Sequence, residues 1–412
     1  MGDIRKTQIQ YSEEKTDIVS SYIIHLLICA LHNNIPSEKP TECSWALLYD
    51  IAKKNNVDST ISPAIQNYEY DIPEEIAKPW KAAKDMTLYR QLRFDMEREQ
   101  ILCKMEEKGI SYLLLKGILV ANYYPIPGMR WFCDNDILYG YVEPNSNGGY
   151  RFKGNSDSER KQGIHVSEEV LCSIMEELGY TAEHIGGTHD TYYKAPFFNF
   201  ELHHRLANPQ SEAEAYYRNP WERALQQENN PLRYYFSDED EYIYLITHAH
   251  KHFSHAGCGI RTLVDEYVIL QKKTSMDWNY IRDELKSLKL DTFELQLRET
   301  ALHTFSEDEQ PTEDEWNMIY FMLGCGTYGT LENRVNQKLE EIQKTQKKGK
   351  VSARWKYVKE RFVLTEQQME DAYPFFYKHK IFRMVLPIYR TMRGFCKHPR
   401  ILLEEFRVWK KF

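Results

Sequence analysis

Two carboxylates spaced two residues apart carry the clearest chemical signal in the sequence. Asp134 and Asp136 lie in the run Cys133-Asp-Asn-Asp-Ile-Leu138, which is typical of a strand. On a strand, residues i and i+2 point to the same face, so both carboxylates would meet at one spot. Adjacent carboxylates repel unless a cation joins them, and oxygen ligands suit Mg²⁺. The pair therefore predicts a site for Mg²⁺ (or Mn²⁺), with a solvated turn as the alternative.

Two basic features nearby could bind phosphate. Lys116 and Gly117 lie where an apolar strand would meet a short helix. A glycine there would let a phosphate approach backbone N–H groups. Arg130, four residues before Asp134, could reach a triphosphate as a bidentate donor. The alternatives are a plain tight turn and a surface arginine.

A third carboxylate lies on a segment that alternates strictly between apolar and polar residues. One face of this predicted strand holds Phe198, Phe200 and Leu202, and the other holds Asn199, Glu201 and His203. A strand that buries aromatic rings on one side could supply Glu201 as a third metal ligand, or place it in a cross-strand salt bridge. Three carboxylates on neighbouring strands suit two-metal phosphoryl or nucleotidyl transfer.

A cluster of histidines follows further along the chain. His248 and His252 are four residues apart on a predicted helix, a spacing that can ligate zinc. The glutamate of an HExxH motif is absent, so a zinc site is the minor alternative. We expect one of these imidazoles to line the nucleotide or acceptor cleft, or to be satisfied by helix packing. Arg261 and Asp265 repeat the spacing and could form a salt bridge within a helix.

The elements that position these residues follow from hydrophobic periodicity and turn residues. Before the carboxylates, the pattern predicts helices over 13–33, 41–55 and 71–108, the last broken near Pro79. Strands are predicted over 111–116, 132–139, 180–185, 188–194 and 197–204, with a loop over 143–162 and a helix over 167–178. After Pro209 the pattern predicts helices over 211–227, 238–255, 259–272, 278–304, 312–323 and 330–345.

The charge is distributed very unevenly along the chain. The net charge is -8, yet residues 344–411 hold 18 Lys or Arg and 6 Asp or Glu, so the remainder carries -20. Large apolar residues interleave with the basic ones after 378. This tail could be an amphipathic helix at a membrane surface, a nucleic-acid-facing patch, or a basic element docked on the acidic body.

The composition predicts a cytoplasmic location. The best apolar run, 18–31, is interrupted by polar residues and is shorter than the roughly 20 residues that a membrane span needs. The first ten residues lack the apolar core of a signal peptide. The eight cysteines are scattered without a CxxC pair, so neither a disulfide framework nor a zinc-thiolate site is suggested.

Several blocks, taken in order, resemble a known family. They are LLLKGILVANYYPIPGMRWFCDNDILY, SEEVLCSIMEELGY, THDTYYKAPFFNFELHHRL, YIYLITHAHKHF and GIRTLVDEYVIL. Over about residues 90–400 the chain resembles the bacterial uncharacterised nucleotidyltransferases of the polymerase-beta-like superfamily. The resemblance implies that Asp134, Asp136 and Glu201 hold divalent metal, and that Lys116 and Gly117 face the nucleotide.

The resemblance also sets the expected fold. It implies an α+β chain, in which a small mixed nucleotidyltransferase sheet with flanking helices is embedded between N-terminal and C-terminal helical regions. We expect four parts: an N-terminal helical region over 1–88, the α/β core over 89–208, a helical domain over 209–343 and a basic amphipathic helical tail over 344–412.

The expected function is metal-dependent transfer of NMP from an NTP such as ATP to a hydroxyl or phosphate. The acceptor could be a small molecule, a protein or an RNA end, and the sequence does not fix the oligomeric state. The turn Lys116-Gly117-Ile118 departs from the Gly-Ser or Gly-Gly usual in the superfamily. The alternative is therefore a catalytically inactive nucleotide-binding or scaffold relative of the same fold.

Overall fold

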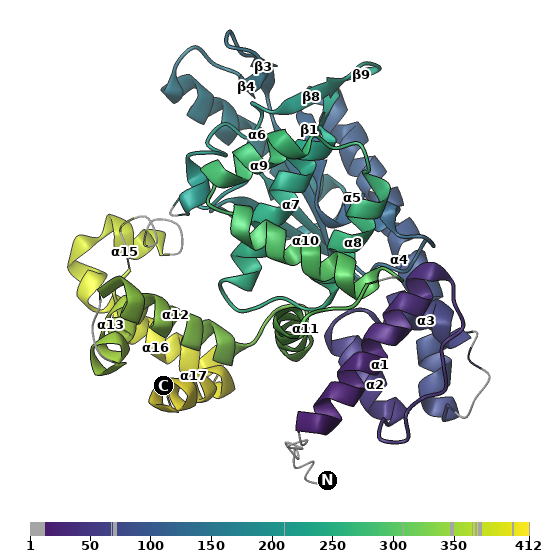
Figure 1. The fold of residues 1–412 in the computed structure, drawn as a ribbon. Helices are drawn as coiled ribbons and strands as arrows, with labels where there is room; N and C mark the ends of the chain where they lie inside the picture. Colours follow the sequence, from purple (N-terminus) through teal and green to yellow (C-terminus); the bar gives the residue numbers. More distant parts are fainter. Residues whose placement is uncertain are drawn as a thin grey trace.

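A seven-stranded mixed sheet lies at the centre of the molecule (Figure 1). The computed structural model describes residues 13–66, 68, 72–209, 211–307, 309–346, 350–364, 366, 369, 373–397 and 399–411. In spatial order the strands are β5 (Thr181–His184), β6 (His189–Lys194), β7 (Phe198–His203), β2 (Asp134–Gly140), β1 (Ser111–Leu115), β9 (Asn230–Phe236) and β8 (Ala224–Gln227). The β2–β7 and β1–β9 pairs are parallel and the other pairs are antiparallel.

One face of the sheet is apolar because strand residues alternate between the two faces. Phe198, Phe200 and Leu202 are buried here, as the alternation predicts, together with Ile137 and Tyr139 of β2. Two helices cover this face: α4 (Glu74–Glu107) and α6 (Asp157–Glu177). The ring of Phe94 from α4 packs edge-on against that of Phe198, with the centroids 5.4 Å apart.

The other face of the sheet carries the polar residues of β7. Leu113, Leu115 and Leu138 are buried on this face and share a core with Tyr244 of helix α7 (Asp238–Phe253). The α7 helix begins at an N-cap, where the side chain of Ser237 accepts a hydrogen bond from the backbone N–H of Asp240. Side chains of α7 therefore face the same side of the sheet as Asp134 and Asp136.

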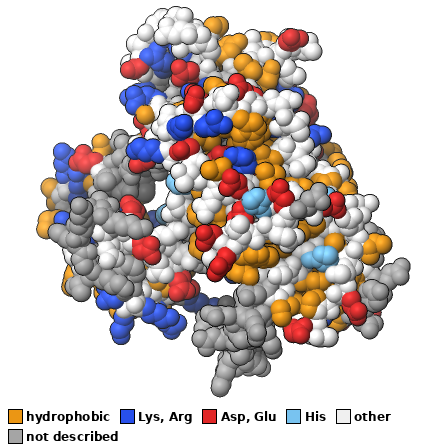
Figure 2. All heavy atoms as spheres, in the orientation of Figure 1, with side chains coloured by type: hydrophobic (Ala, Val, Ile, Leu, Met, Phe, Trp, Pro, Cys, Tyr) orange, Lys and Arg blue, Asp and Glu red, His pale blue; other side chains and the backbone are white. Residues whose placement is uncertain are grey.

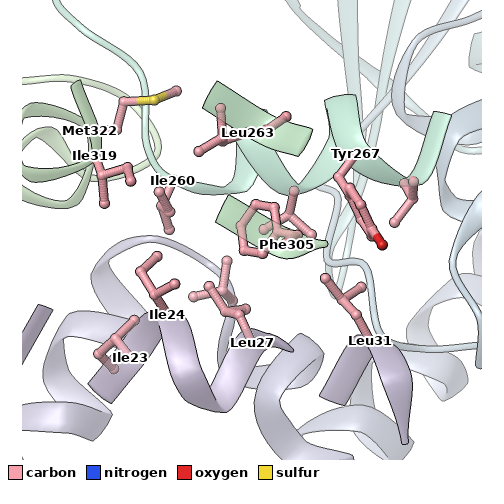
Figure 3. Close-up of a cluster of buried hydrophobic side chains, with 14 of the residues drawn as sticks. Ile23, Ile24, Leu27, Leu31, Ile260, Leu263, Tyr267, Phe305, Ile319 and Met322 are labelled. Atoms are coloured by element: carbon pink, nitrogen blue, oxygen red, sulfur yellow. The ribbon is translucent and has the colours of Figure 1, made fainter. Parts of the chain in front are cut away.

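A large helical core lies beside the sheet and joins the two ends of the sequence. In Figure 3, Ile24, Leu27 and Leu31 of α1 (Glu13–His32) point toward Leu263 and Phe305. The remaining helices of this part are α2 (Trp45–Lys54), α3 (Asp58–Gln66), α8 (Arg261–Lys272), α9 (Trp278–Ser287), α10 (Asp291–Phe305) and α11 (Glu313–Cys325). The helices before residue 88 and those between 238 and 325 thus share one hydrophobic core.

The predicted helix over 211–227 is wrong. The segment contains a short 3-10 turn, η2 (Glu212–Glu214), and then the strand β8, which together with the following strand β9 extends the sheet. In β9 the buried side chains Tyr234 and Phe236 are two residues apart, as a half-buried strand requires. The ring of Trp221 packs edge-on against that of Tyr234, at 5.3 Å between centroids, so tertiary packing overrides the local helical preference.

Two other expectations need correction. The α4 helix runs unbroken through Pro79, which removes only one hydrogen bond close to the helix start, while Trp80 and Ala83 are buried. The segment 143–162 is not a plain loop. It contains the hairpin β3 (Val142–Pro144) and β4 (Tyr150–Phe152), and then the first turns of α6, which begin at the N-cap Ser156.

The C-terminal part is helical and forms a lobe beside the body (Figure 1). Its elements are α12 (Leu331–Gln346), α13 (Lys350–Phe362), α15 (Pro374–Lys378), η3 (Lys380–Met384), α16 (Leu386–Lys397) and α17 (Pro399–Lys411). Val335 and Leu339 of α12 share a small core with Val408 of α17. A search of the described helices finds none long and apolar enough to cross a bilayer.

Candidate functional site

Three carboxylates come together on the sheet face that α7 covers. The β2 and β7 strands are neighbours, and their register places Asp136 opposite Glu201 and Asp134 opposite Asn199. Directly opposed residues point to the same face, so Asp134, Asp136 and Glu201 share one surface. The side-chain amide Nδ2 of Asn199 donates a hydrogen bond to Asp134 Oδ1 at 2.8 Å.

Lys116 lies against this group of carboxylates. It follows the last residue of β1, and its Nζ lies 2.6 Å from Asp136 Oδ1 in a nearly buried ion pair. The backbone of Lys116 has φ 53°, a left-handed conformation that side-chain-bearing residues seldom adopt. This turn directs the ammonium group toward the carboxylates, and such strain often marks functional positions.

The three carboxyl groups differ in acidity. Burial alone would raise the pKa of Asp136, but the charge of Lys116 and a hydrogen bond from His203 hold it well below its usual value. Burial and the negative charge of Asp136 raise the pKa of Glu201 to about 8. Burial also raises the pKa of Asp134, although the hydrogen bond from Asn199 opposes this shift. The raised pKa of Glu201 favours its protonated form near pH 7.

Two imidazoles complete this surface, one of which, His189, the sequence analysis did not name. His189 of β6 pairs in register with His203 of β7, and the Nε2 atom of each lies 3.7 Å from Glu201 Oε2. The ligand atoms of His189, Glu201 and His203 all lie within 4.8 Å of one another. His203 Nε2 also lies 2.9 Å from Asp136 Oδ1. The polar alternation of 199–203 pointed to His203, but only the register of β6 against β7 brings in His189.

Helix α7 brings further polar groups toward the carboxylates. Tyr244, His248, Lys251 and His252 recur at helical spacing on this helix. Burial and the charge of Lys116 lower the pKa of His248 well below its usual value. Burial and the neighbouring positive charges, first that of Lys251, lower the pKa of His252 to about 4. The two imidazoles contact each other, with their Nε2 atoms 3.1 Å apart, so both are neutral at pH 7.

Arg130, which the sequence predicts to bind phosphate, forms a buried ion pair with Asp265. Its Nε and Nη2 donate to the two carboxylate oxygens of Asp265 at 2.7 and 2.8 Å. Its Nη1 donates to the carbonyl oxygen of Gly117 at 3.3 Å. The side chain of Arg130 is only 8% exposed, so this bidentate pair occupies its donors and holds α8 against the turn after β1. Asp265 thus pairs with Arg130, and Arg261 Nη1 donates to the carbonyl oxygen of Trp131 at 2.9 Å.

Close packing around Gly117 leaves little room for a side chain at this position. A Cβ atom at this position would lie 3.0 Å from Arg130 Nη1 and 3.3 Å from Phe132 Cβ. The α5 helix that it begins (Gly117–Val120) is a single turn followed by the 3-10 turn η1 (Ala121–Tyr123). A side chain at this position would therefore require Arg130 or Phe132 to shift.

Two basic groups near the carboxylates were missed by the sequence analysis as site residues. Burial raises the pKa of Asp134, and the positive charge of Arg261 is one of the effects that oppose this rise. The pKa of Lys251 is lowered by burial and by Lys116, while Glu201 and Asp136 oppose this shift. Lys116, Lys251 and Arg261 therefore bring positive charge to the carboxylate group from three different elements.

The donor set fits a divalent cation. Carboxylate oxygens from Asp134, Asp136 and Glu201 suit Mg²⁺ or Mn²⁺, whereas the imidazoles of His189 and His203 also suit softer ions such as Zn²⁺. Two observations show that negative charge is concentrated here: Lys116 lies in contact with Asp136, and the pKa of Glu201 is raised. A cation would relieve both effects.

The fold and these residues define a class of protein. A mixed sheet flanked by helices, with acidic residues on one face, is an α+β nucleotidyltransferase-like fold. A family model described as "Uncharacterised nucleotidyltransferase" matches residues 41–141 and 168–306, more than half of the chain. The chain belongs to this family, which supports a general role in nucleotidyl transfer. No curated protein and no solved structure matches it.

Proposed function

We propose that this protein transfers a nucleoside monophosphate from an NTP to an acceptor hydroxyl or phosphate and releases pyrophosphate. The observation that carries the proposal is the register of β2 and β7, which places Asp134, Asp136 and Glu201 on one face. Membership of the nucleotidyltransferase family supports the same reaction class.

Asp134, Asp136 and Glu201 would hold Mg²⁺ or Mn²⁺, with His189 and His203 beside them. A divalent cation bound here would neutralise phosphate charge and help to ionise the acceptor hydroxyl. Glu201 must lose its proton to act as a ligand, and because its pKa is raised to about 8, cation binding near pH 7 would displace this proton.

The basic residues of the chain would act on the triphosphate. Lys116 contacts Asp136 in the present structure and could move to a phosphate oxygen once another cation neutralises Asp136. Lys251 and Arg261 would add charge from α7 and α8, and His248 and His252 would border the nucleotide or acceptor as neutral imidazoles. We do not assign Arg130 to the phosphates, because its guanidinium is bound to Asp265.

In the proposed step an acceptor oxygen bonds to the α-phosphorus. The bond from that phosphorus to the bridging oxygen breaks, and pyrophosphate leaves. The proton of the acceptor passes to a site carboxylate or to water. Positioning and charge neutralisation supply most of the rate enhancement in reactions of this kind.

The experiment is a search for the acceptor. Cell extract is incubated with each of four NTPs labelled at the α-phosphate, together with Mg²⁺ or Mn²⁺ and the purified protein, and labelled products are identified by mass spectrometry. We expect label on a product with the wild-type chain and with Asp85→Asn, an exposed control, and none with Asp134→Asn. Equal labelling by Asp134→Asn would contradict the proposed role of the carboxylates.

A further inference from the structure

The C-terminal lobe exposes a row of large apolar side chains. Ile381, Met384, Ile388, Met392 and Phe395 are 88, 87, 61, 64 and 53% exposed. Their spacing of three or four residues keeps them on one side of a helical path, which runs from η3 through α16. We call these five residues the apolar stripe. Solvent-facing rows of this kind mark interaction surfaces.

The other side of α16 is the side that packs within the lobe. Leu386 is only 3% exposed, and Arg390 Nη1 donates to the carbonyl oxygen of Arg361 at 3.0 Å. A Cβ atom at Gly394 would lie 3.1 Å from Leu402 Cδ1, so α17 approaches α16 closely at this point. The internal contacts of the lobe therefore leave the apolar stripe uncovered.

Like α16, the α17 helix has one side packed within the lobe and one side exposed to solvent. Val408 and Glu405 are buried toward α12 and α13, where Glu405 accepts hydrogen bonds from Tyr357 and Arg361. On its outer side, Leu403 and Phe406 are 53 and 59% exposed. The basic residues Arg407, Lys410 and Lys411 follow them closely in the sequence.

Positive charge surrounds these apolar side chains. Residues 374–411 contain ten Lys or Arg and two Asp or Glu, a net charge of +8. Basic and apolar side chains lie close together on the visible face of the lobe, at the left of Figure 2. Together they form a surface that is both basic and apolar, attached to an acidic body.

We propose that the apolar stripe binds the surface of an anionic lipid bilayer, with α16 lying in the interface between headgroups and acyl chains. Amphipathic helices that bind in this way combine a buried apolar face with Lys and Arg, which attract anionic headgroups. The acidic body would be repelled by the same surface, which would orient the molecule with its lobe toward the membrane.

Two other occupants fit the surface less well. A second copy of the chain would bring the same surface against itself in a two-fold dimer, and two charges of +8 would repel each other. A nucleic acid would neutralise the basic residues, but its phosphates would gain nothing from Ile381, Ile388 or Met392. A bilayer satisfies both the charge and the apolar side chains.

The test is co-sedimentation of the full-length chain with vesicles. One set of vesicles contains equal parts of phosphatidylglycerol and phosphatidylcholine, and the other contains phosphatidylcholine alone. The variant Ile388→Asp/Met392→Asp removes the centre of the apolar stripe at two exposed positions. The matched control is Ile35→Asp, which changes an isoleucine that is 76% exposed outside the lobe.

We expect binding to the phosphatidylglycerol vesicles, binding that weakens as salt rises, and little binding to phosphatidylcholine alone. The double variant should bind at least about tenfold more weakly at an unchanged melting temperature, and Ile35→Asp should bind like wild type. Three results would each overturn the proposal: equal vesicle binding by the double variant, binding of RNA or duplex DNA without vesicle binding, or a dimer that the double variant dissociates.

Discussion

At the residue scale, Lys116 and Glu201 respond in opposite ways to the same concentration of negative charge. Lys116 forms an ion pair with Asp136 and keeps that carboxylate ionised. Glu201, which faces the same carboxylate, keeps its proton because a second unpaired negative charge would be costly there. One lysine and one proton thus offset negative charge at the carboxylates, and under the proposed function a divalent cation would replace both.

From the raised pKa of Glu201 we predict that the affinity for a divalent cation depends on pH. Ionisation of Glu201 accompanies binding, so affinity for Mn²⁺ should rise with pH up to about pH 8 and then level off. If one proton is displaced, the increase should approach tenfold per pH unit. Titration of the wild-type protein followed by Mn²⁺ electron paramagnetic resonance measures this dependence between about pH 6 and pH 9.

The control for this titration is Glu201→Gln, which cannot ionise at this position. It should bind Mn²⁺ more weakly and lose most of the rise in affinity with pH. A wild-type affinity that stays constant across the range would show that Glu201 is not a ligand.

Part of the site could be predicted from the sequence because its signals are local. The spacing of Asp134 and Asp136 and the alternation around Glu201 each lie within six residues. The partner of Arg130 could not be predicted, since Asp265 is 135 residues away and no periodicity links them.

The sequence suggested three mutually repelling carboxylates, but Lys116 neutralises Asp136. Replacing Asp136 would therefore leave a buried ammonium unpaired, which makes Glu201 the cleaner position to test.

At the element scale, each strand that contributes to the site is fixed by buried residues on the opposite face. The β7 strand cannot shift by one residue without exposing Phe198, Phe200 and Leu202, so its register keeps Glu201 toward α7. The strands around the carboxylates followed from the sequence for this reason. The β8–β9 hairpin did not, because its place beside β1 depends on the packing of Trp221 and Tyr234.

The Arg130–Asp265 pair connects two elements that border the site. Asp265 of α8 accepts two hydrogen bonds from Arg130 and one from the hydroxyl of Tyr124 at 2.7 Å. Asp265→Asn would leave a buried guanidinium without its counter-ion, and removing one partner of such a pair costs about 3–5 kcal/mol. We expect a lower free energy of unfolding by about that amount, measured by urea denaturation.

The comparison variant for this measurement is Asp157→Asn. Asp157 pairs with Arg160 at the surface and its side chain is 90% exposed, so its replacement should change stability little. Equal effects of the two substitutions would mean that the buried pair does not hold α8 against the turn after β1.

At the scale of the whole molecule, charge and packing separate the C-terminal lobe from the body. The acidic body contains the sheet and the shared helical core, whereas the lobe has its own small core around Val335, Leu339 and Val408. The tail therefore packs on α12, rather than only on the acidic surface that the sequence offered as one alternative. None of the interactions described at the carboxylate site involves a residue after Gln346.

Because Val408 lies in the small core of the lobe, we expect Val408→Asp to destabilise the lobe and not the rest of the molecule. Val408 is 7% exposed, so an aspartate there would place a charge among apolar side chains and undock α17. Trypsin should then cleave the basic lobe at least several-fold faster, while nucleotide binding stays unchanged. Leu403→Asp, on the exposed side of the same helix, should leave the rate of cleavage close to that of wild type. Rapid loss of the lobe in the wild-type chain would contradict its having a folded core.

The central claim is that Asp134, Asp136 and Glu201 together form one site, which binds a nucleotide when a divalent cation is present. The most direct test is equilibrium dialysis of labelled ATP with Mg²⁺ or with a chelator, using wild type, Glu201→Gln and the exposed control Glu183→Gln. Glutamine resembles the protonated form of Glu201, so the melting temperature should be unchanged or slightly higher. We predict Mg²⁺-dependent binding by wild type and by Glu183→Gln, and binding at least about tenfold weaker by Glu201→Gln. A folded Glu201→Gln that binds ATP with wild-type affinity and the same dependence on Mg²⁺ would contradict the claim.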